Sequence, residues 1–147
     1  METIIKTLQE HAVFCAVFDQ IEKVCARLTT AQEFRVLSAV VEGLLARHSR
    51  TETELACVAL DHVLAQQGKL KRLHQDHQEI DAHFKRVQGA GSLAEAQSQL
   101  AKALATSRGH FRNEEKNVFP LIERLLSGEV PGCLEEVRSQ EYSTVAA

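Results

Sequence analysis

Apolar residues recur every three or four positions along most of this chain, and that spacing predicts helices. The expected helices cover about residues 3–28, 30–66, 69–87 and 92–126, and a short further helix is expected over about 133–141. Two helices have a clear start, because Thr30–Glu33 and Ser92–Glu95 fit the pattern in which a hydroxyl and a carboxylate cap the first turn. The apolar stripes expected to face the core include Leu8, Phe18, Ile21 and Val24 on the first helix and Val36, Val40, Val41, Leu44 and Leu45 on the second.

Four long helices joined by short connections fold most simply as an up-down-up-down bundle. The expected fold is therefore all-α, an antiparallel four-helix bundle with a short C-terminal helix. No linker or low-complexity tract divides the 147 residues. We therefore expect a single domain over residues 1–147, with its core over about 3–127 and an appendage over 128–147.

Composition supports helices and argues against several classes of protein. Two prolines and 5% aromatic residues, in a chain with 44% hydrophobic residues, are typical of a soluble helical protein. The net charge of −3 offers no basic surface for nucleic acid, and no apolar run approaches the ~18 residues of a membrane span. The first residues do not resemble an export signal, and the four cysteines lack C-x-x-C spacing. We therefore expect a cytoplasmic protein with free thiols, and neither nucleic acid nor membrane as a partner.

The candidate chemistry begins with His110 and Glu114, an imidazole and a carboxylate four residues apart. On a helix this spacing places both groups on one face, one turn from each other. Val118 and Leu121 continue along the same side, so the pair is expected to face the core. Burying an ionisable pair is costly unless it is hydrogen-bonded or coordinated, and a metal ion is one way to satisfy it.

The other helices supply histidines at a matching level. In antiparallel neighbours, residues equally far from the connecting turn lie at equal depth. His11 and His48 are centred on the first expected turn, and His77 and His110 are centred close to the third. The midpoint between His48 and His77 lies near His62, about five residues before the expected break at Gly68. At the helical rise of about 1.5 Å per residue this is a mismatch of about 7 Å, which a sloping connection can absorb. Glu52 follows His48 by one turn, as Glu114 follows His110.

The candidate metal ligands share this level and are His11, His48, Glu52, His77, His110 and Glu114. Four imidazoles and two carboxylates in one core suit a pair of transition-metal ions, because each histidine binds one ion and each carboxylate can bridge both. Histidine-rich ligation with bridging carboxylates fits iron and keeps positions open for a small ligand. The alternative is that these are ordinary helix histidines, in which case the chain is a metal-free helical interaction module.

The same segments resemble the hemerythrin-like, HHE cation-binding family. The resemblance rests on Leu-Gln-Glu-His11, His48-x-x-x-Glu52, Asp-His77-Gln-Glu-Ile and above all His110-Phe-Arg-Asn-Glu114-Glu-Lys-Asn-Val-Phe-Pro. It spans about Leu8 to Leu126, most of the chain. The resemblance implies a four-helix bundle that holds two non-haem iron ions with a bridging oxo or hydroxo group.

One position departs from the oxygen-carrying members of that family. Those proteins have two histidines four apart on the third helix, whereas here the residue four before His77 is Leu73, and His74 is three before. Residues three apart still share a helix face, so His74 is a possible additional ligand or a surface residue. A residue three before His77 is rotated by about 60° from it around the helix, whereas a residue four before is rotated by about 40° to the other side. The direction of the His74 side chain therefore argues against ligation. A set of four histidines and two glutamates resembles members linked to iron–sulfur repair, nitric oxide or oxygen sensing more than oxygen carriers.

The expected function is therefore binding, sensing or reduction of O2, NO or peroxide at a di-iron centre, in the response to iron or redox stress. Another class with the same centre is an oxidoreductase that acts on an organic substrate. The sequence shows no substrate pocket, so enzymatic activity stays open. Cys15, one turn after His11, is expected either to line the site or to fill the core.

Overall fold

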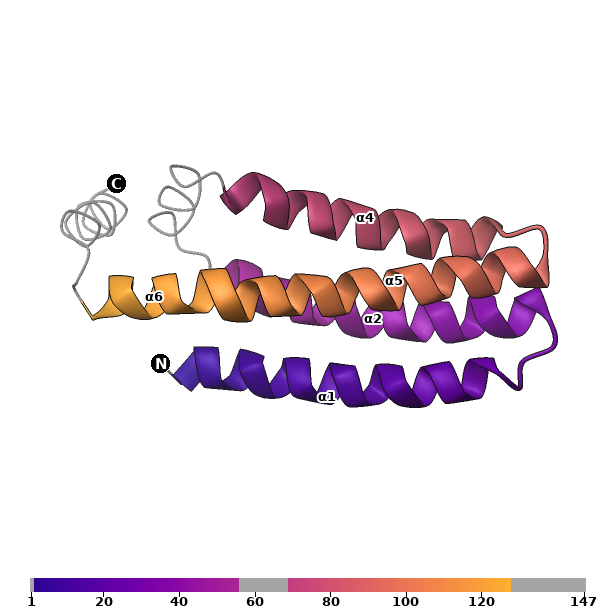
Figure 1. The fold of residues 1–147 in the computed structure, drawn as a ribbon, viewed down its shortest axis with the longest axis horizontal. Helices are drawn as coiled ribbons and strands as arrows, with labels where there is room; N and C mark the ends of the chain where they lie inside the picture. Colours follow the sequence, from indigo (N-terminus) through magenta and orange to yellow (C-terminus); the bar gives the residue numbers. More distant parts are fainter. Residues whose placement is uncertain (1, 56–68, 128–147) are drawn as a thin grey trace, which may run out of the picture.

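Helices form where the apolar spacing predicts them. The computed structural model describes residues 2–55 and 69–127, with the backbone alone for residues 2–4, 51–55, 69–70 and 125–126. Its helices are α1 (Glu2–Cys25), α2 (Ala31–Leu55), α4 (Lys69–Gly89), α5 (Leu93–Asn113), the π-helical turn η1 (Glu114–Val118) and α6 (Phe119–Leu126). The last three form one continuous rod, and neighbouring long helices run in opposite directions (Figure 1). The predicted all-α up-down-up-down bundle is confirmed, and no described residue lies in a strand.

The observed boundaries differ from the predicted ones in a few places. The first helix ends at Cys25, three residues early, because the next N–H groups bond three residues back: Arg27 donates to the Val24 carbonyl at 2.8 Å. The fourth predicted helix does run to Leu126, but the π-helical turn η1 divides it into α5 and α6. The end of the second predicted helix, beyond residue 55, and the helix expected over 133–141 lie outside the described residues.

Both predicted capping boxes are present at the turns. The Glu33 N–H donates to Thr30 Oγ1 at 3.2 Å, and the Thr30 N–H donates back to Glu33 Oε2 at 2.9 Å. The Glu95 N–H likewise donates to Ser92 Oγ at 3.2 Å, while the Glu95 carboxylate accepts from the N–H of Gly91 at 2.9 Å. These bonds satisfy N–H groups that the first helical turn leaves unpaired. They start α2 and α5 at defined residues and thereby set the level of the histidines further along.

The core lies along the centre of the bundle and is dominated by aromatic and aliphatic side chains. Its most buried large members are Phe18, Phe34, Phe84, Leu100 and Leu104. On α2 the inward line runs through Phe34, Ser38, Val41, Leu45 and His48. The prediction was wrong for Val36, Val40 and Leu44, which are 45–58% exposed, and on α1 for Leu8 and Val24, which are 38% and 44% exposed. Val40 and Leu44 directly precede the buried Val41 and Leu45, which places them about 100° around the helix from the core face.

Two arginines fasten the helices that carry the candidate ligands. Arg108 on α5 donates to Asp19 at 2.7 Å and to Glu22 at 2.6 Å, both on α1. Arg35 at the start of α2 donates to the carbonyl of Ala90 at 2.7 Å, in the turn between α4 and α5. α1 and α2 are thereby held against the α4–α5 pair. Among the described helices, none combines the length and the apolar character that crossing a membrane requires.

Candidate metal centre

Histidines from four helices meet inside the bundle in two groups that share one carboxylate. His11 from α1, His48 from α2 and Glu114 from η1 form the first group, which we call the inner group. His77 from α4, His110 from α5 and the same Glu114 form the second, which we call the outer group. In each group one ligand atom per residue lies within 4.8 Å of the others. All these side chains are buried except His77, which is half-buried.

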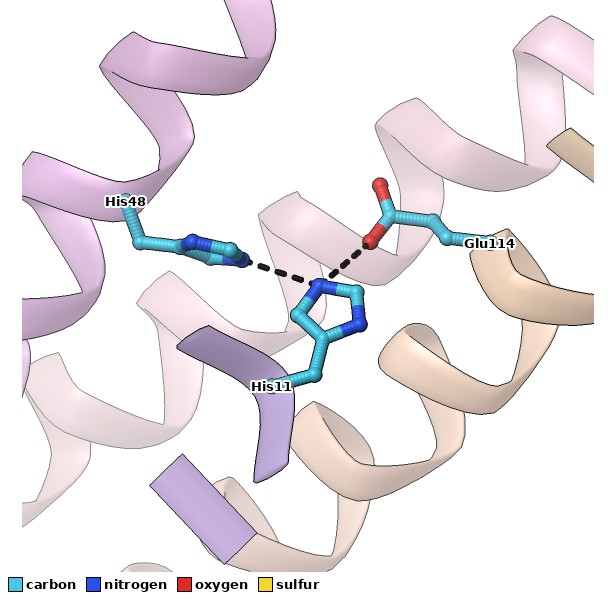
Figure 2. Close-up of side chains that lie close together, drawn as sticks. All are labelled: His11, His48 and Glu114. Carbon is cyan, nitrogen blue, oxygen red and sulfur yellow. Dashed lines mark hydrogen bonds and ion pairs between the residues drawn. The ribbon is translucent and has the colours of Figure 1, made fainter. Parts of the chain in front are cut away.

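Within each group the two imidazoles face each other through their Nε2 atoms. The Nε2 atoms of His11 and His48 are 3.1 Å apart, and those of His77 and His110 are 2.8 Å apart. Figure 2 shows His11 between His48 and Glu114, with each side chain coming from a different helix. The inward nitrogens of each pair therefore point at a common position.

Glu114 divides its two oxygens between the groups. Its Oε2 lies 3.4 Å from Nε2 of His11, and its Oε1 lies 3.3 Å from Nε2 of His110. A carboxylate placed in this way is the arrangement that bridges two metal ions, because each oxygen belongs to a different donor set. The contact of Glu114 with His110 follows from their predicted spacing of four residues on one helix. The contact with His11 requires the packing of α1 on the fourth rod.

Two further carboxylates hold the outward nitrogens of the inner group. Nδ1 of His11 lies 3.0 Å from Oε1 of Glu115, and Nδ1 of His48 lies 2.8 Å from Oε2 of Glu10. A carboxylate accepts hydrogen bonds, so both imidazoles carry the hydrogen on Nδ1. Each then directs the lone pair of Nε2 inward, which is the tautomer that a metal ion needs.

A carboxylate also lies beside the outer group. Nδ1 of His110 lies 3.7 Å from Oδ2 of Asp76, beyond hydrogen-bond distance but within ion-pair range. Burial raises the pKa of the Asp76 carboxyl, with nearby Arg72 acting in the opposite direction. The inner group is the more deeply buried of the two, because His77 in the outer group is half-buried.

Aromatic rings wall the inner group from the rest of the bundle. Phe111 stacks on His11 with ring centroids 4.2 Å apart and an angle of 16° between the planes. Phe119 also stacks on His11, at 5.5 Å, and Phe14 lies 5.1 Å from the ring of His48. This packing fixes the imidazole planes, and it keeps water from the ring of His11, which is 1% exposed.

The π-helical turn lies directly at the shared carboxylate. The N–H of Phe119 bonds to the carbonyl of Glu114, five residues back, instead of four. Pro120 has no N–H to continue the α-helical ladder at this point. The wider turn buries Val118 and Phe119, although they are adjacent in sequence. Turns of this kind are frequent at functional sites.

The structure does not bring every candidate residue into these groups. His74 is exposed and belongs to neither group. Cys15 is half-buried, packs against the hydrophobic core, and has its thiol pKa raised by burial. The backbone of Glu52 lies on α2, but its side chain is outside the described residues, so its prediction as a ligand stays a prediction.

The sequence reasoning missed the carboxylates of Glu10 and Glu115 as partners of the imidazoles. Each is next in sequence to a candidate ligand, Glu10 to His11 and Glu115 to Glu114. Each contacts a histidine on a different helix, so neither helical spacing nor periodicity reveals it. The one signal in the sequence is that each carboxylate directly adjoins a candidate ligand. An adjacent residue is rotated by about 100° around the helix, so its side chain can reach the neighbouring helix.

The donor set fits a transition-metal ion in each group. Two ligands of one ion lie about 3 Å apart, because metal–nitrogen bonds are about 2.1 Å long. The Nε2 pairs at 3.1 and 2.8 Å and the Nε2–carboxylate distances of 3.4 and 3.3 Å match this separation. Imidazoles with a shared carboxylate suit iron, zinc and similar ions.

The fold and this site define a class of protein: helical bundles that gather histidine and carboxylate ligands for metal in the core. The family model described as the hemerythrin HHE cation-binding domain matches residues 3–122. The chain belongs to this family, as the sequence motifs predicted. Comparisons with curated proteins and with solved structures give no match.

Proposed function

We propose that this chain binds two iron ions, one in the inner group and one in the outer group, and uses them to bind, sense or reduce a small ligand. The observation that carries this proposal is the position of Glu114, with one oxygen 3.4 Å from the inner His11 and the other 3.3 Å from the outer His110. Membership of a cation-binding family supports it. An iron pair supplies reversible electron transfer and an open coordination position for the ligand.

The chain's own residues then have separate tasks. His11 and His48 hold one ion, with their orientation set by Glu115 and Glu10. His77 and His110 hold the other, and Glu114 links the two. The stacked rings around His11 exclude water, so that a bound ligand meets a largely apolar surrounding on that side.

The proposed ligands are O2, NO and peroxide, in a role in iron or redox stress. The exposed position of His74 supports a set of four histidines, which leaves more coordination positions for an added ligand than a set of five. The half-buried thiols of Cys15 and Cys25, both free, agree with a cytoplasmic site of action. Neither a nucleic acid nor a membrane is part of the proposal.

Metal content tests the proposal directly. Protein reconstituted with ferrous iron without air, then freed of unbound metal, should contain two irons per chain. On exposure to air it should develop near-ultraviolet absorption from a bridged ferric pair. Substoichiometric iron would favour the metal-free helical module instead.

The carboxylates give a sharper test. Glu114→Ala should abolish binding of the two-ion unit, because one side chain contacts both groups. Glu52→Ala should do the same if Glu52 is the second bridge. Glu123→Ala, an exposed carboxylate on α6, is the matched control and should keep two irons. Retention of two irons in both Glu114→Ala and Glu52→Ala contradicts the bridging assignment. Turnover assays with organic substrates distinguish the oxidoreductase alternative.

A further inference from the structure

A cavity of about 290 Å³ lies against one side of the centre, between α2 and α4. Its inner surface contains His48, His77, His110 and Phe111. The cavity therefore touches both histidines of the outer group but only one of the inner group. His11, which is 1% exposed behind its stacked rings, is not part of the lining.

Part of the cavity wall is apolar. Leu45 from α2 and Ile80 and Phe84 from α4 form this part, and all three belong to the buried core. A water molecule takes up about 30 Å³ in the liquid, so this volume admits a molecule of a few atoms with room to spare.

The solvent side of the cavity is acidic. Asp81 from α4 is exposed and Glu42 from α2 is half-buried, whereas the histidines at the other end are buried or half-buried. Ala46, also exposed, lies beside them in the lining. None of the described residues that line the cavity is a lysine or an arginine. Two carboxylates at an opening repel anions and leave neutral molecules unaffected.

From these observations we propose that the cavity between α2 and α4 is the route by which a small uncharged molecule reaches the centre, with Glu42 and Asp81 at its mouth discriminating against anions. This inference rests on the proposed iron centre and adds to it a direction of entry and a charge selectivity. The molecule reaches the centre from this side, because His48, His77 and His110 line the cavity and His11 does not.

The route is tested by closing its mouth. Ala46→Trp places a large ring at an exposed lining position, and Ala39→Trp is the matched control. Ala39 is exposed on the same face of α2, seven residues earlier, and does not line the cavity. Association of nitric oxide with the reduced, iron-loaded protein should slow by at least about tenfold in Ala46→Trp and stay at the wild-type rate in Ala39→Trp.

The charge selectivity is tested with a second pair of variants. In Glu42→Gln/Asp81→Asn, azide, an anion, should associate with the oxidised protein about tenfold faster at low ionic strength, while the nitric oxide rate is unchanged. Added salt should reduce this gain. Glu79→Gln, an exposed position on α4 outside the cavity lining, should leave both rates unchanged. Equal azide rates in the double variant and the wild type overturn the selectivity.

A readout without iron chemistry tests the same cavity. In protein loaded with zinc, dissolved dioxygen is a paramagnetic probe and should broaden the methyl NMR signals of Leu45 and Ile80 more than those of Leu100 and Leu104, which are buried away from the cavity. Equal broadening contradicts the route.

The outcomes separate the two proposals. A wild-type chain that takes up no iron overturns both of them. A chain with two irons whose nitric oxide rate is the same in Ala46→Trp as in the wild type overturns the route and leaves the iron centre standing.

Discussion

At the scale of single residues, the orientation of the imidazoles is set by carboxylates that do not themselves face the metal positions. Glu115 and Glu10 accept hydrogen bonds from Nδ1 of His11 and His48 and so direct each Nε2 inward. Carboxylates in this position raise the basicity of a histidine ligand and fix its ring. The inner group has two such bonds, and it is also the more deeply buried of the two groups.

Removal of one of these carboxylates should weaken metal binding without removing a ligand. Glu115→Ala is expected to lower metal affinity by about 10- to 100-fold, because His11 loses its orienting acceptor. Glu115→Gln should retain most of the affinity, since its amide oxygen can accept the same hydrogen bond. Competition with a chelator measures the difference. An affinity in Glu115→Ala equal to that in Glu115→Gln would falsify the orienting role.

The two neighbouring histidines of α4 should behave differently. His77 faces His110 at 2.8 Å, whereas His74 is exposed and outside both groups. His74→Ala should therefore keep two irons and most of the visible spectrum, and His77→Ala should lose iron from the outer group. Iron analysis of both variants decides the matter. If His74→Ala loses as much iron as His77→Ala, the centre has five histidines and the oxygen-carrier interpretation gains support.

At the scale of secondary-structure elements, helix starts and one irregular turn place the ligands. The caps at Thr30 and Ser92 begin α2 and α5, and the π-helical turn begins at the shared Glu114. The cap at the first turn is densely bonded: Glu33 accepts from the N–H groups of Thr29 and Thr30, each at 2.9 Å. These bonds lower the pKa of the Glu33 carboxyl, with the Thr29 N–H as the largest cause.

This cap should make part of the stability depend on pH. Because the folded pKa of Glu33 is below its ordinary value of 4.5, the cap stabilises the protein fully above that value and the contribution is lost as pH falls through the lowered pKa. Wild-type protein should therefore exceed Glu33→Gln in urea resistance near neutral pH, with the difference shrinking in acid. Glu123→Gln serves as the control on an exposed carboxylate outside any cap. A difference that grows in acid contradicts this sign.

At the scale of the whole molecule, the centre joins all four rods of the bundle. Its described candidate ligands come from α1, α2, α4, α5 and η1, so they meet only in the folded chain. An ion that binds this arrangement stabilises the folded state and not the unfolded one. Metal binding and bundle stability are thereby coupled.

Metal should raise the unfolding midpoint by an amount that depends on its free concentration. At a free ion concentration 100 times the Kd, the expected gain is about 2.7 kcal/mol over metal-free protein. Glu114→Ala should lose most of this gain, because both groups lose their shared oxygen donor. Thermal unfolding with and without metal measures it. Equal metal-dependent gains in the wild type and Glu114→Ala would show that the ion binds elsewhere.

The amino-acid sequence by itself determined the fold class, the helix starts and the level at which four histidines lie. These properties depend on local chemistry: a hydroxyl and a carboxylate three residues apart cap a helix, and 3.6 residues per turn place His110 and Glu114 on one face. Equal distance from a turn was enough to pair His11 with His48, which meet at 3.1 Å.

The tertiary structure alone decided the remaining features. Exposure of Val36, Val40 and Leu44 depends on which helices α2 packs against, and their apolar character does not reveal it. Glu10 contacts a histidine 38 positions away, and Glu115 contacts one 104 positions away. The unequal burial of the two groups also depends on how the helices pack. The cavity between α2 and α4 likewise depends on how two helices approach each other. Such properties come from the packing of elements distant in sequence, whereas helical periodicity acts only within one element.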